Sequence, residues 1–497
     1  MNNNIRISNR FINAAGCLLL ATPLVVFFAT WLKPVVGLAA SLLLILASVG
    51  FCRNNRDSGY VEIKRCDFFV AMIMLLVFVW FCGLGGAFYQ TGDNHTRNAL
   101  FRDLINEQWP VIYGKTDNAL VYYLFFWLIP ALTGKLAGWT LANFILYLQG
   151  VLFIVVTLLN IYGLLSENRA FGKMSKIVFL FAVFNGLNLA GRFVSSRLGW
   201  CDPFSWIGTN EGWLDFIRNG YDCSYLYRGT YDSICQVYNQ AIPVWLATSI
   251  YLRYREPKYC AFIGLLAFPY GPIPFVGLFI LIAFDQLISF VKAGKSCFKI
   301  VRDAFSFINI CGVISALVFI LYFMCNSTCS HIGAYVPLSE YGYERIITLI
   351  LFYIFEFGLY SILTYKENKN NSLWWIANIS LIIIPLIRLG YGRDFCMNAS
   401  IPALFVIMLA LMQVMVTDHK YAVRQWLLTV CVTIAAMSAV LGVGEKILIM
   451  GYTRQFPIVA DDCYSYCERM PDQKEYDPFN YLVPDYNDKM FYKYLAK

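Results

Sequence analysis

Charged and polar groups gather in the stretch 92–114, GDNHTRNALFRDLINEQWPVIYG, which lies between two long apolar runs. Asp93 is the first charged residue after the preceding run, and His95, Arg97 and Arg102 follow closely. A carboxylate at the boundary of water and lipid could act as a general base that takes a proton from an acceptor hydroxyl. Asp93 could instead cap the helix that follows, since Asp and Asn are favoured at that position.

The residues after Asp93 show helical periodicity over 98–107. One face carries apolar side chains and the other carries polar ones. The pattern predicts an amphipathic helix at the membrane interface that stops at Trp109 and Pro110. The apolar face has Leu100, Phe101, Leu104 and Ile105, and the polar face has Arg97, Arg102, Asp103 and Asn106.

A second polar stretch, 193–240, is rich in aromatic residues, acids and amides. Aromatic rings can cover the apolar faces of sugars while polar groups bond their hydroxyls. Arg228 belongs to this stretch, and Asn239 with Gln240 would lie at the outer end of the helix that follows. An aromatic belt at the membrane interface is the alternative explanation of the rings.

The third group is Arg388, Arg393 and Asp394, in LIRLGYGRDFCMNASIPALF. Two guanidinium groups at the membrane edge suit a phosphate or diphosphate, which arginine binds through paired hydrogen bonds. Anchoring to phospholipid head groups is the alternative.

Glu356, Asn185 and Asn188 fall inside apolar runs. Ionisable and amide groups are costly in lipid, so they should face the protein interior, and Glu356 is a further functional candidate.

The composition predicts the elements that must position these groups. Of 497 residues, 59% are hydrophobic and 14% are charged, against roughly 25% charged in a soluble domain. Apolar runs recur along the whole chain, which excludes a soluble domain of ordinary size between them. We therefore expect an all-α, polytopic integral membrane protein with 13 or 14 transmembrane helices and amphipathic interfacial helices in the outside loops. The expected spans are 11–32, 36–52, 67–90, 119–133, 139–165, 177–191, 241–254, 259–269, 273–291, 304–324, 345–365, 373–388, 400–417 and 425–445.

Basic residues in the short loops predict the orientation. Arg6, Arg10 and the basic residues of 53–65 place the N-terminus and the second loop in the cytoplasm, so the stretch 92–114 lies outside. The expected parts are an N-terminal hairpin with its cytoplasmic loop (1–66), a transmembrane core (67–445) with outside loops 91–118 and 193–240, and a short outside tail (446–497). One conflict remains, since 119–165 must cross an odd number of times and yet resembles two helices. Either 121–132 is re-entrant or interfacial, or a neighbouring span is misassigned.

Two further classes of partner are disfavoured by the sequence. The net charge of +8 lies largely in short loops, where it sets orientation, and this argues against nucleic acid. The sixteen cysteines lie mostly in apolar runs and form no zinc-ligand pattern, so no metal site is predicted. Disulfides on an oxidising face remain open, because the pairing cannot be derived from spacing.

Asp93 after an early membrane helix, the helix near 98–107 and the Tyr-rich segment LVYYLFFWLIPALTGKLAG together resemble the C-type (GT-C) fold of multi-pass glycosyltransferases. The motifs DNHTRNALFRDLINEQWPV, YNQAIPVWL and RDFCMNASIPALF also resemble uncharacterised bacterial membrane proteins of surface-polysaccharide loci. The first resemblance implies a sugar donor on a polyprenyl phosphate and a catalytic acid at Asp93. Many such enzymes carry two neighbouring acids in this loop, whereas here the next acid is Asp103.

These observations lead to three hypotheses. The first is a glycosyltransferase of the inner (plasma) membrane, working on its outer face, which moves sugar from a polyprenyl-phosphate donor to a lipid or glycan acceptor. No cofactor is predicted with certainty for this reaction, and a divalent cation could take part in it. The second is a polymerase or ligase of O-antigen or capsule, and the third is a flippase or transporter of a lipid-linked saccharide. In the first, Asp93 is the base, and the substrate-binding residues are His95, Arg97, Arg102, Arg228, Asn239, Gln240, Arg388, Arg393 and Asp394.

Overall fold

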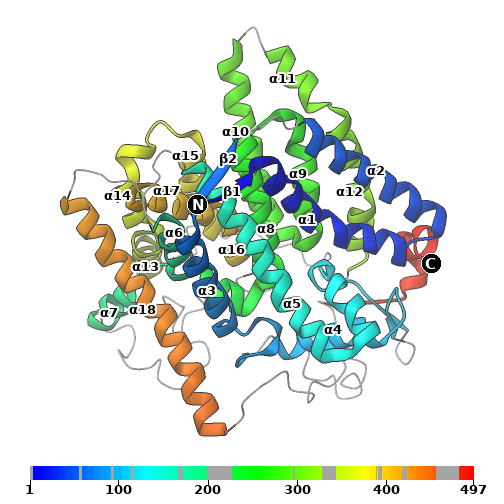
Figure 1. Cartoon of the computed structure of the whole chain (residues 1–497), viewed down its shortest axis with the longest axis horizontal. Helices are drawn as coiled ribbons and strands as arrows, with labels where there is room; N and C mark the ends of the chain where they lie inside the picture. The colour runs from blue at the N-terminus through cyan, green and yellow to red at the C-terminus, as the bar shows by residue number, and fades with distance from the viewer. Residues whose placement is uncertain are drawn as a thin grey trace.

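A computed structural model gives the structure of most of the chain (Figure 1). The described residues are 4–54, 59–90, 94–113, 117–165, 172–198, 226–294, 297–326, 343–387, 389, 394–416, 422–454 and 481–497.

Helices make up nearly all of the described structure, as the apolar runs predict. The helices of the first half are α1 (Asn9–Trp31), α2 (Pro34–Asn54), α3 (Arg65–Phe81), α4 (Asn94–Asn106), α5 (Leu128–Leu164), α6 (Lys173–Val183), α7 (Asn188–Arg197) and α8 (Thr230–Tyr254). Those of the second half are α9 (Cys260–Ala267), α10 (Pro272–Ala293), α11 (Cys297–Ala304), α12 (Phe307–Phe323), α13 (Tyr343–Tyr353), α14 (Leu359–Asn368), α15 (Ser372–Ile383), α16 (Asp394–Ala399), α17 (Ile401–Val416) and α18 (Ala422–Thr453).

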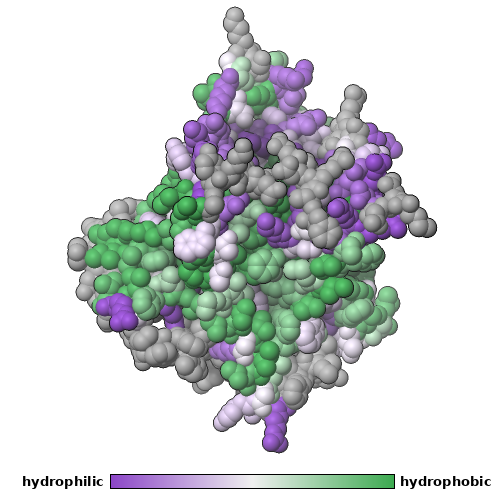
Figure 2. Space-filling model, turned by 60° about the vertical axis from the view of Figure 1, so that its left-hand side comes forward, coloured by the Kyte–Doolittle hydropathy of each residue, from purple (hydrophilic) through white to green (hydrophobic). Residues whose placement is uncertain are grey.

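Several outer helices present continuous apolar stripes that no other part of the described chain covers. On α2 the exposed residues recur at helical spacing, and Figure 2 shows a broad hydrophobic surface of this kind, with hydrophilic residues gathered toward the top. Exposing such a surface to water costs about 25 cal/mol of free energy per Å², so we expect the surface to contact lipid. The chain is therefore a multi-pass membrane protein of the all-α class, as expected. The stripe of α2 consists of Val35, Leu38, Leu42, Ile45, Leu46 and Val49.

Among the described residues, seven helical stretches are long and apolar enough to cross a membrane, or eight if the bent pair α11 and α12 is one span. The expected 13 or 14 crossings stay a prediction, because this count omits helices under 18 residues such as α3, α15 and α17. The seven are Asn9–Trp31, Pro34–Arg53, Phe125–Leu164, Lys173–Val194, Pro272–Ala293, Ile346–Asn368 and Val423–Thr453.

The segment 119–165 contributes one candidate span, Phe125–Leu164, and a single span agrees with the odd number of crossings expected there. Residues Asn118–Leu120 form a strand, and α5 then runs to Leu164 with a break at Gly138, whose φ is 84°. Glycine tolerates this left-handed conformation because it has no Cβ. A short helical piece before Gly138 therefore takes the place of the separate span expected over 119–133.

Loops expected on the same side of the membrane meet at one end of the molecule, here called the basic end. Strand β1 (Asn4–Ser8) pairs antiparallel with β2 (Tyr60–Lys64), which comes from the loop between α2 and α3. Tyr162, near the end of α5, donates a hydrogen bond to the Glu62 carbonyl at 2.8 Å. These contacts join the ends of α1, α2, α3 and α5 on one side.

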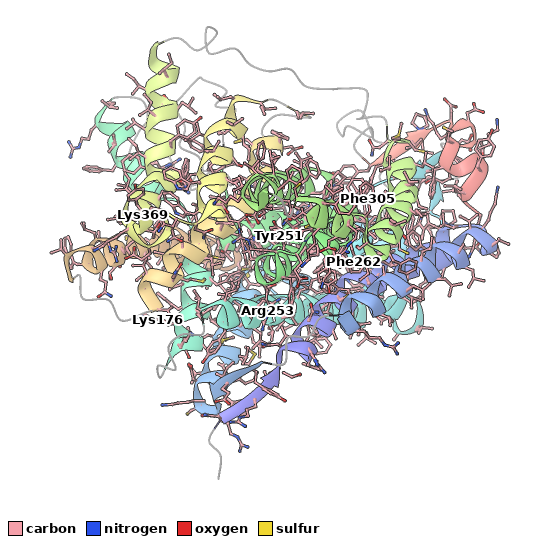
Figure 3. The ribbon with its side chains drawn as sticks, turned by 90° about the horizontal axis from the view of Figure 1, so that it is seen from above. Lys176, Tyr251, Arg253, Phe262, Phe305 and Lys369 are labelled. Atoms are coloured by element: carbon pink, nitrogen blue, oxygen red, sulfur yellow. The ribbon has the colours of Figure 1, made fainter. Side chains whose placement is uncertain are left out.

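The end of α8 reaches the same basic end. Arg253 donates to Asn160 Oδ1 of α5 at 3.3 Å. Figure 3 looks onto this end, where Tyr251 and Arg253 of α8 lie near the middle, with Lys176 and Lys369 to one side. The loops that carry the positive charge are thus gathered together, as the charge pattern predicts.

The C-terminal tail packs at the opposite end. Strands β3 (Ile112–Tyr113), β4 (Asn118–Leu120) and β5 (Leu482–Pro484) form one antiparallel sheet, so the tail completes a structure begun in the loop between α4 and α5. The Lys497 amide donates to the Trp31 carbonyl at 3.0 Å, at the end of α1. The tail therefore covers the ends of helices.

Candidate functional site

Helix α4 is the amphipathic helix predicted after Asp93, but it is packed inside the protein at the end opposite the basic end. It packs along α5, and its apolar residues Leu100, Phe101 and Leu104 are buried as expected. Two residues of its polar face, Arg97 and Asp103, are also buried. The simple placement on a lipid surface is corrected here, because α5 and α8 supply partners for both faces.

Asp103 is held by a structural contact. Its carboxylate accepts a hydrogen bond from Tyr113 Oη at 2.8 Å, and the side chain is fully buried. This arrangement ties α4 to β3. Asp103 is therefore occupied in fixing the loop and does not supply a second acid facing solvent beside Asp93.

Helix α8 begins earlier than the expected span 241–254. It starts at Thr230 and contains a non-helical residue, Val237, with φ of −138°. The two carbonyls just before this break accept side-chain donors from α4. Asn94 Nδ2 donates to the Cys235 carbonyl at 2.9 Å, and Arg97 Nη1 donates to the Gln236 carbonyl.

Two amide residues of α8 lie deeper in the protein than predicted. Asn239 and Gln240 were expected at the outer end of the helix, yet they lie inside it and are buried. Asn239 Nδ2 donates to the Tyr123 carbonyl at 3.5 Å, and the Gln240 amide oxygen faces Gly271 between α9 and α10. Other parts of the protein, rather than lipid, surround these groups.

A set of polar side chains from four elements surrounds Arg97, and we call it the Arg97 cluster. Arg97 interacts with the hydroxyl of Tyr122, whose ring lies 3.7 Å from that of Tyr123. Asp394, the exposed first residue of α16, acts electrostatically on Tyr123. The members are Arg97, Tyr122, Tyr123, Tyr238, Asn239 and Asp394.

The tyrosines of the loop before α5 stay neutral at physiological pH. Burial raises the pKa of Tyr122 well above its usual value, and the nearby Arg97 cation opposes this only in part. Burial also raises the pKa of Tyr123, and the Asp394 carboxylate raises it further. Both phenols therefore remain hydrogen-bond donors, which can bond oxygen atoms of a ligand.

The other predicted site residues in the described part of the chain have different surroundings. His95 is exposed on α4. The Arg102 guanidinium lies over the Trp139 ring of α5, 4.7 Å from its centroid. Arg228 precedes α8 and acts electrostatically on Asp232. Asp93, Arg388 and Arg393 lie outside the described residues, although Asp93 directly precedes α4 and Arg393 directly precedes Asp394.

A second buried group adjoins the same part of α8, and it was not predicted from the sequence. Lys446 Nζ, from α18, donates to the Cys82 carbonyl and to Cys235 Sγ, both at 3.2 Å. The ammonium also lies 5.2 Å from the centre of the Tyr231 ring, and its charge acts on Asp232. We call Cys82, Tyr231, Asp232, Cys235 and Lys446 the Lys446 cluster. The charged pair Glu445 and Lys446, at the end of an expected span, was the available signal.

The predicted inward facing of Glu356, Asn185 and Asn188 is confirmed, since all three are buried. Helix α6 ends at Val183 and α7 begins at Asn188, so one candidate span is interrupted. Glu356 lies in a π-helical turn (Ile354–Gly358), and its carboxylate faces Gly186 in this interruption.

Comparisons with known proteins add no family to this picture. No family model, curated protein or solved structure matches the chain. Within the described part of the chain, His, Cys, Asp and Glu form no group of three or more that could hold a metal ion. The residues and the fold therefore carry the functional argument.

Proposed function

We propose that this protein is a membrane glycosyltransferase of GT-C type, which transfers sugar from a polyprenyl-phosphate donor to a lipid or glycan acceptor in cell-surface polysaccharide or glycolipid assembly. In this proposal it resides in the inner (plasma) membrane with the N-terminus in the cytoplasm. The Arg97 cluster then faces the outer side, where acceptors of this kind are found.

The Arg97 cluster is the observation that carries the proposal. Asp93 precedes α4 by one residue, and α4 brings Arg97 against α8 and the Tyr122 hydroxyl. Asn239 of α8 bonds the Tyr123 carbonyl, and Asp394, which follows Arg393 in the chain, acts on Tyr123 from α16. Segments far apart in the sequence thus bring a cation, phenols, an amide and a carboxylate to one end of the membrane core. Such convergent polar groups are typical of ligand sites.

In the proposed reaction the acceptor hydroxyl attacks the anomeric carbon of the donor sugar. A new carbon–oxygen bond forms, the bond from that carbon to the phosphate oxygen breaks, and polyprenyl phosphate leaves with the bonding electron pair. The Asp93 carboxylate takes the hydroxyl proton. Arg97 and the two tyrosine hydroxyls would bind donor oxygens, and Arg388 with Arg393 would hold the lipid phosphate.

Replacing Asp93 by Asn tests the proposal. The amide keeps the size of the side chain and can still cap α4, but it cannot accept the proton. In cells whose own copy of the gene is replaced by D93N, mass spectrometry should show lipid-linked sugar accumulating and the product glycan lost. Asp117→Asn, an exposed acid in the turn before β4, is the matched control and should leave the glycan unchanged. A normal amount of product glycan in cells with D93N, at a normal level of the protein, would contradict the proposal.

A second candidate, a transporter of a lipid-linked saccharide, is favoured by one observation. The interruption between α6 and α7 faces the buried Glu356, and broken membrane helices beside an acid are common in transporters. Leu187 N donates to the Phe355 carbonyl at 2.8 Å, which fixes the interruption to the π-helical turn. For a transporter, Glu356→Gln should abolish movement of the lipid across the membrane while D93N leaves it intact. The opposite pair of results supports the glycosyltransferase.

A further inference from the structure

Two cysteines of the Lys446 cluster come from distant parts of the chain and meet beside the Arg97 cluster. Cys82 is the first residue after α3, and Cys235 lies in α8 two residues before the break at Val237. Both cysteines are free in the structure, and their thiols lie close enough to act on each other electrostatically. Lys446 Nζ touches both residues, the first through its carbonyl and the second through its sulfur, at 3.2 Å each.

Their position matters because the segment between α3 and α4 carries Asp93. Cys82 stands where this segment begins, and Asn94, where α4 begins, donates to the carbonyl of Cys235 itself. A covalent bond between the two sulfurs would fix the start of the segment to the same residue of α8 that already holds its end. The connection would restrict the positions open to Asp93 relative to Arg97.

We propose that Cys82 and Cys235 are a modification site, joined by a disulfide that a thiol–disulfide oxidoreductase of the outer compartment introduces. The proposal rests on the orientation given under the proposed function, which places this end of the molecule in an oxidising compartment. Its role is to hold the Asp93 segment against α8.

The chemistry is a pair of thiol–disulfide exchanges. The Cys235 thiolate attacks the disulfide of the oxidoreductase, a mixed disulfide forms and one thiolate of the oxidoreductase leaves. The Cys82 thiolate then attacks the Cys235 sulfur and releases the second thiolate. Two electrons pass to the oxidoreductase, and the two protons lost by the cysteines end on its two thiols.

The order in which the helices are synthesised determines when the thiol–disulfide exchange can take place. In the folded chain Cys82 and Cys235 are 2% and 6% exposed, and Lys446 of α18 covers them. Helix α18 follows α3 and α8 by a long stretch of chain and is made later. Exchange therefore takes place before α18 packs, and α18 then shields the disulfide from reductants.

The chain holds an internal control in a second cysteine pair. Cys17 of α1 and Cys52 of α2 also interact thiol to thiol. Cys52 lies near the end of α2, close to the basic end that we place in the reducing cytoplasm. The thiols of each pair act on each other, and the proposed orientation places the two pairs in different compartments.

The experiment measures both pairs in cells that make the full chain. Acid quenching stops exchange, and N-ethylmaleimide in denaturant labels every free thiol. Reduction and a heavier maleimide then label the thiols that had been oxidised. We expect most of Cys82 and Cys235 to carry the heavy label and to appear, without reduction, as one linked peptide pair. Cys17 and Cys52 should carry the light label.

Variants make the result decisive. In Cys82→Ser, Cys235 should become free, and D93N should keep the linkage, because the acid takes no part in it. Light label on both pairs overturns the disulfide and leaves the glycosyltransferase standing. Heavy label on both pairs, or on Cys235 in the Cys82→Ser variant, also overturns it, since compartment or partner is then wrong. Heavy label on Cys17 and Cys52 alone overturns the orientation as well.

Discussion

The buried charge of Arg97 is the strongest functional signal at the scale of single residues. Its side chain is 5% exposed within a membrane protein, where an ion is expensive unless partners compensate it. The Gln236 carbonyl and the Tyr122 hydroxyl are two such partners. A guanidinium carries five N–H donors in a fixed geometry that matches phosphate oxygens, which suits the phosphate of the proposed donor.

Replacing Arg97 by Gln should therefore reduce transfer while the protein still folds. A hydrogen bond from a charged group contributes about 1.5 to 3 kcal/mol, so we expect a loss of roughly tenfold to a hundredfold in kcat/KM. The measurement is the rate of sugar transfer in membranes with equal amounts of folded protein.

Arg102→Gln is the matched control on the same helix, because the structure sets the Arg102 guanidinium against Trp139 of α5, whereas the sequence had suggested a substrate contact. Its guanidinium lies over Trp139, so its loss should lower the thermal stability by about 0.5 to 1 kcal/mol and leave transfer near normal. Equal loss of transfer in the two variants would mean that α4 as a whole, and not the Arg97 charge, matters for the reaction.

Sequence reasoning found part of the Arg97 cluster and could not find the rest. Arg97, Asn239 and Asp394 were predicted as binding residues, because a polar group at a membrane edge is conspicuous. The tyrosines of the cluster, Tyr122, Tyr123 and Tyr238, were not predicted individually, since a phenol is common near any membrane interface. Only the packing of α5 against α8 selects these three from the 33 tyrosines of the chain.

At the scale of elements, α8 is the element on which both polar clusters are built. It runs through the centre of the bundle (Figure 1) and is almost wholly buried from Thr230 to Leu252. Its polar first half, TYDSICQVYNQ, has too low a hydropathy to be recognised as a membrane helix from sequence. Its polar groups find partners on α4, on α18 and in the break between α6 and α7, so the helix forms where composition predicted a loop.

Close approach of α10 to α16 offers a test of how α16 is positioned. A Cβ on Gly277 of α10 would collide with the backbone carbonyl of Ala399, the last residue of α16. We expect Gly277→Ala to displace α16 and its Asp394, to cost about 1 to 3 kcal/mol of stability, and to reduce transfer. Thermal unfolding and transfer assays measure the two effects.

Gly444 provides the comparison, because it is also helical and a Cβ at this position would have no other atom within 4 Å. Gly444→Ala should leave transfer unchanged and raise the stability by about 0.5 to 1 kcal/mol, since alanine favours helix. If the two alanines had the same effect, contact between α10 and α16 would not explain the loss.

At the scale of the whole molecule, the two ends differ in how the chain closes them. The basic end is closed by the strand pair of β1 and β2, and the opposite end is closed by the C-terminal tail. Charge patterning predicted which loops share an end, because basic residues are counted directly from sequence. It could not predict that the tail returns to the first outside loop, since pairing of β5 with β4 depends on contacts distant in sequence.

Phe491 is the residue through which the tail enters the core. It is fully buried, and its ring lies 5.2 Å from that of Tyr322 in α12 and 6.2 Å from that of Phe27 in α1. Phe491→Ala removes these contacts and leaves a cavity, which typically costs about 3 to 5 kcal/mol. We expect a clear fall in the unfolding temperature of the purified protein in detergent. Tyr494→Ala, in the same turn but 57% exposed, should leave that temperature nearly unchanged.

Because the tail joins α1, α12 and the sheet that contains β3 and β4, its release should also loosen the loop before α5 that carries Tyr122. The rate of sugar transfer by Phe491→Ala should then fall at temperatures where the rest of the protein is still folded. An unchanged rate at those temperatures would show that the tail stabilises the membrane core without supporting the site.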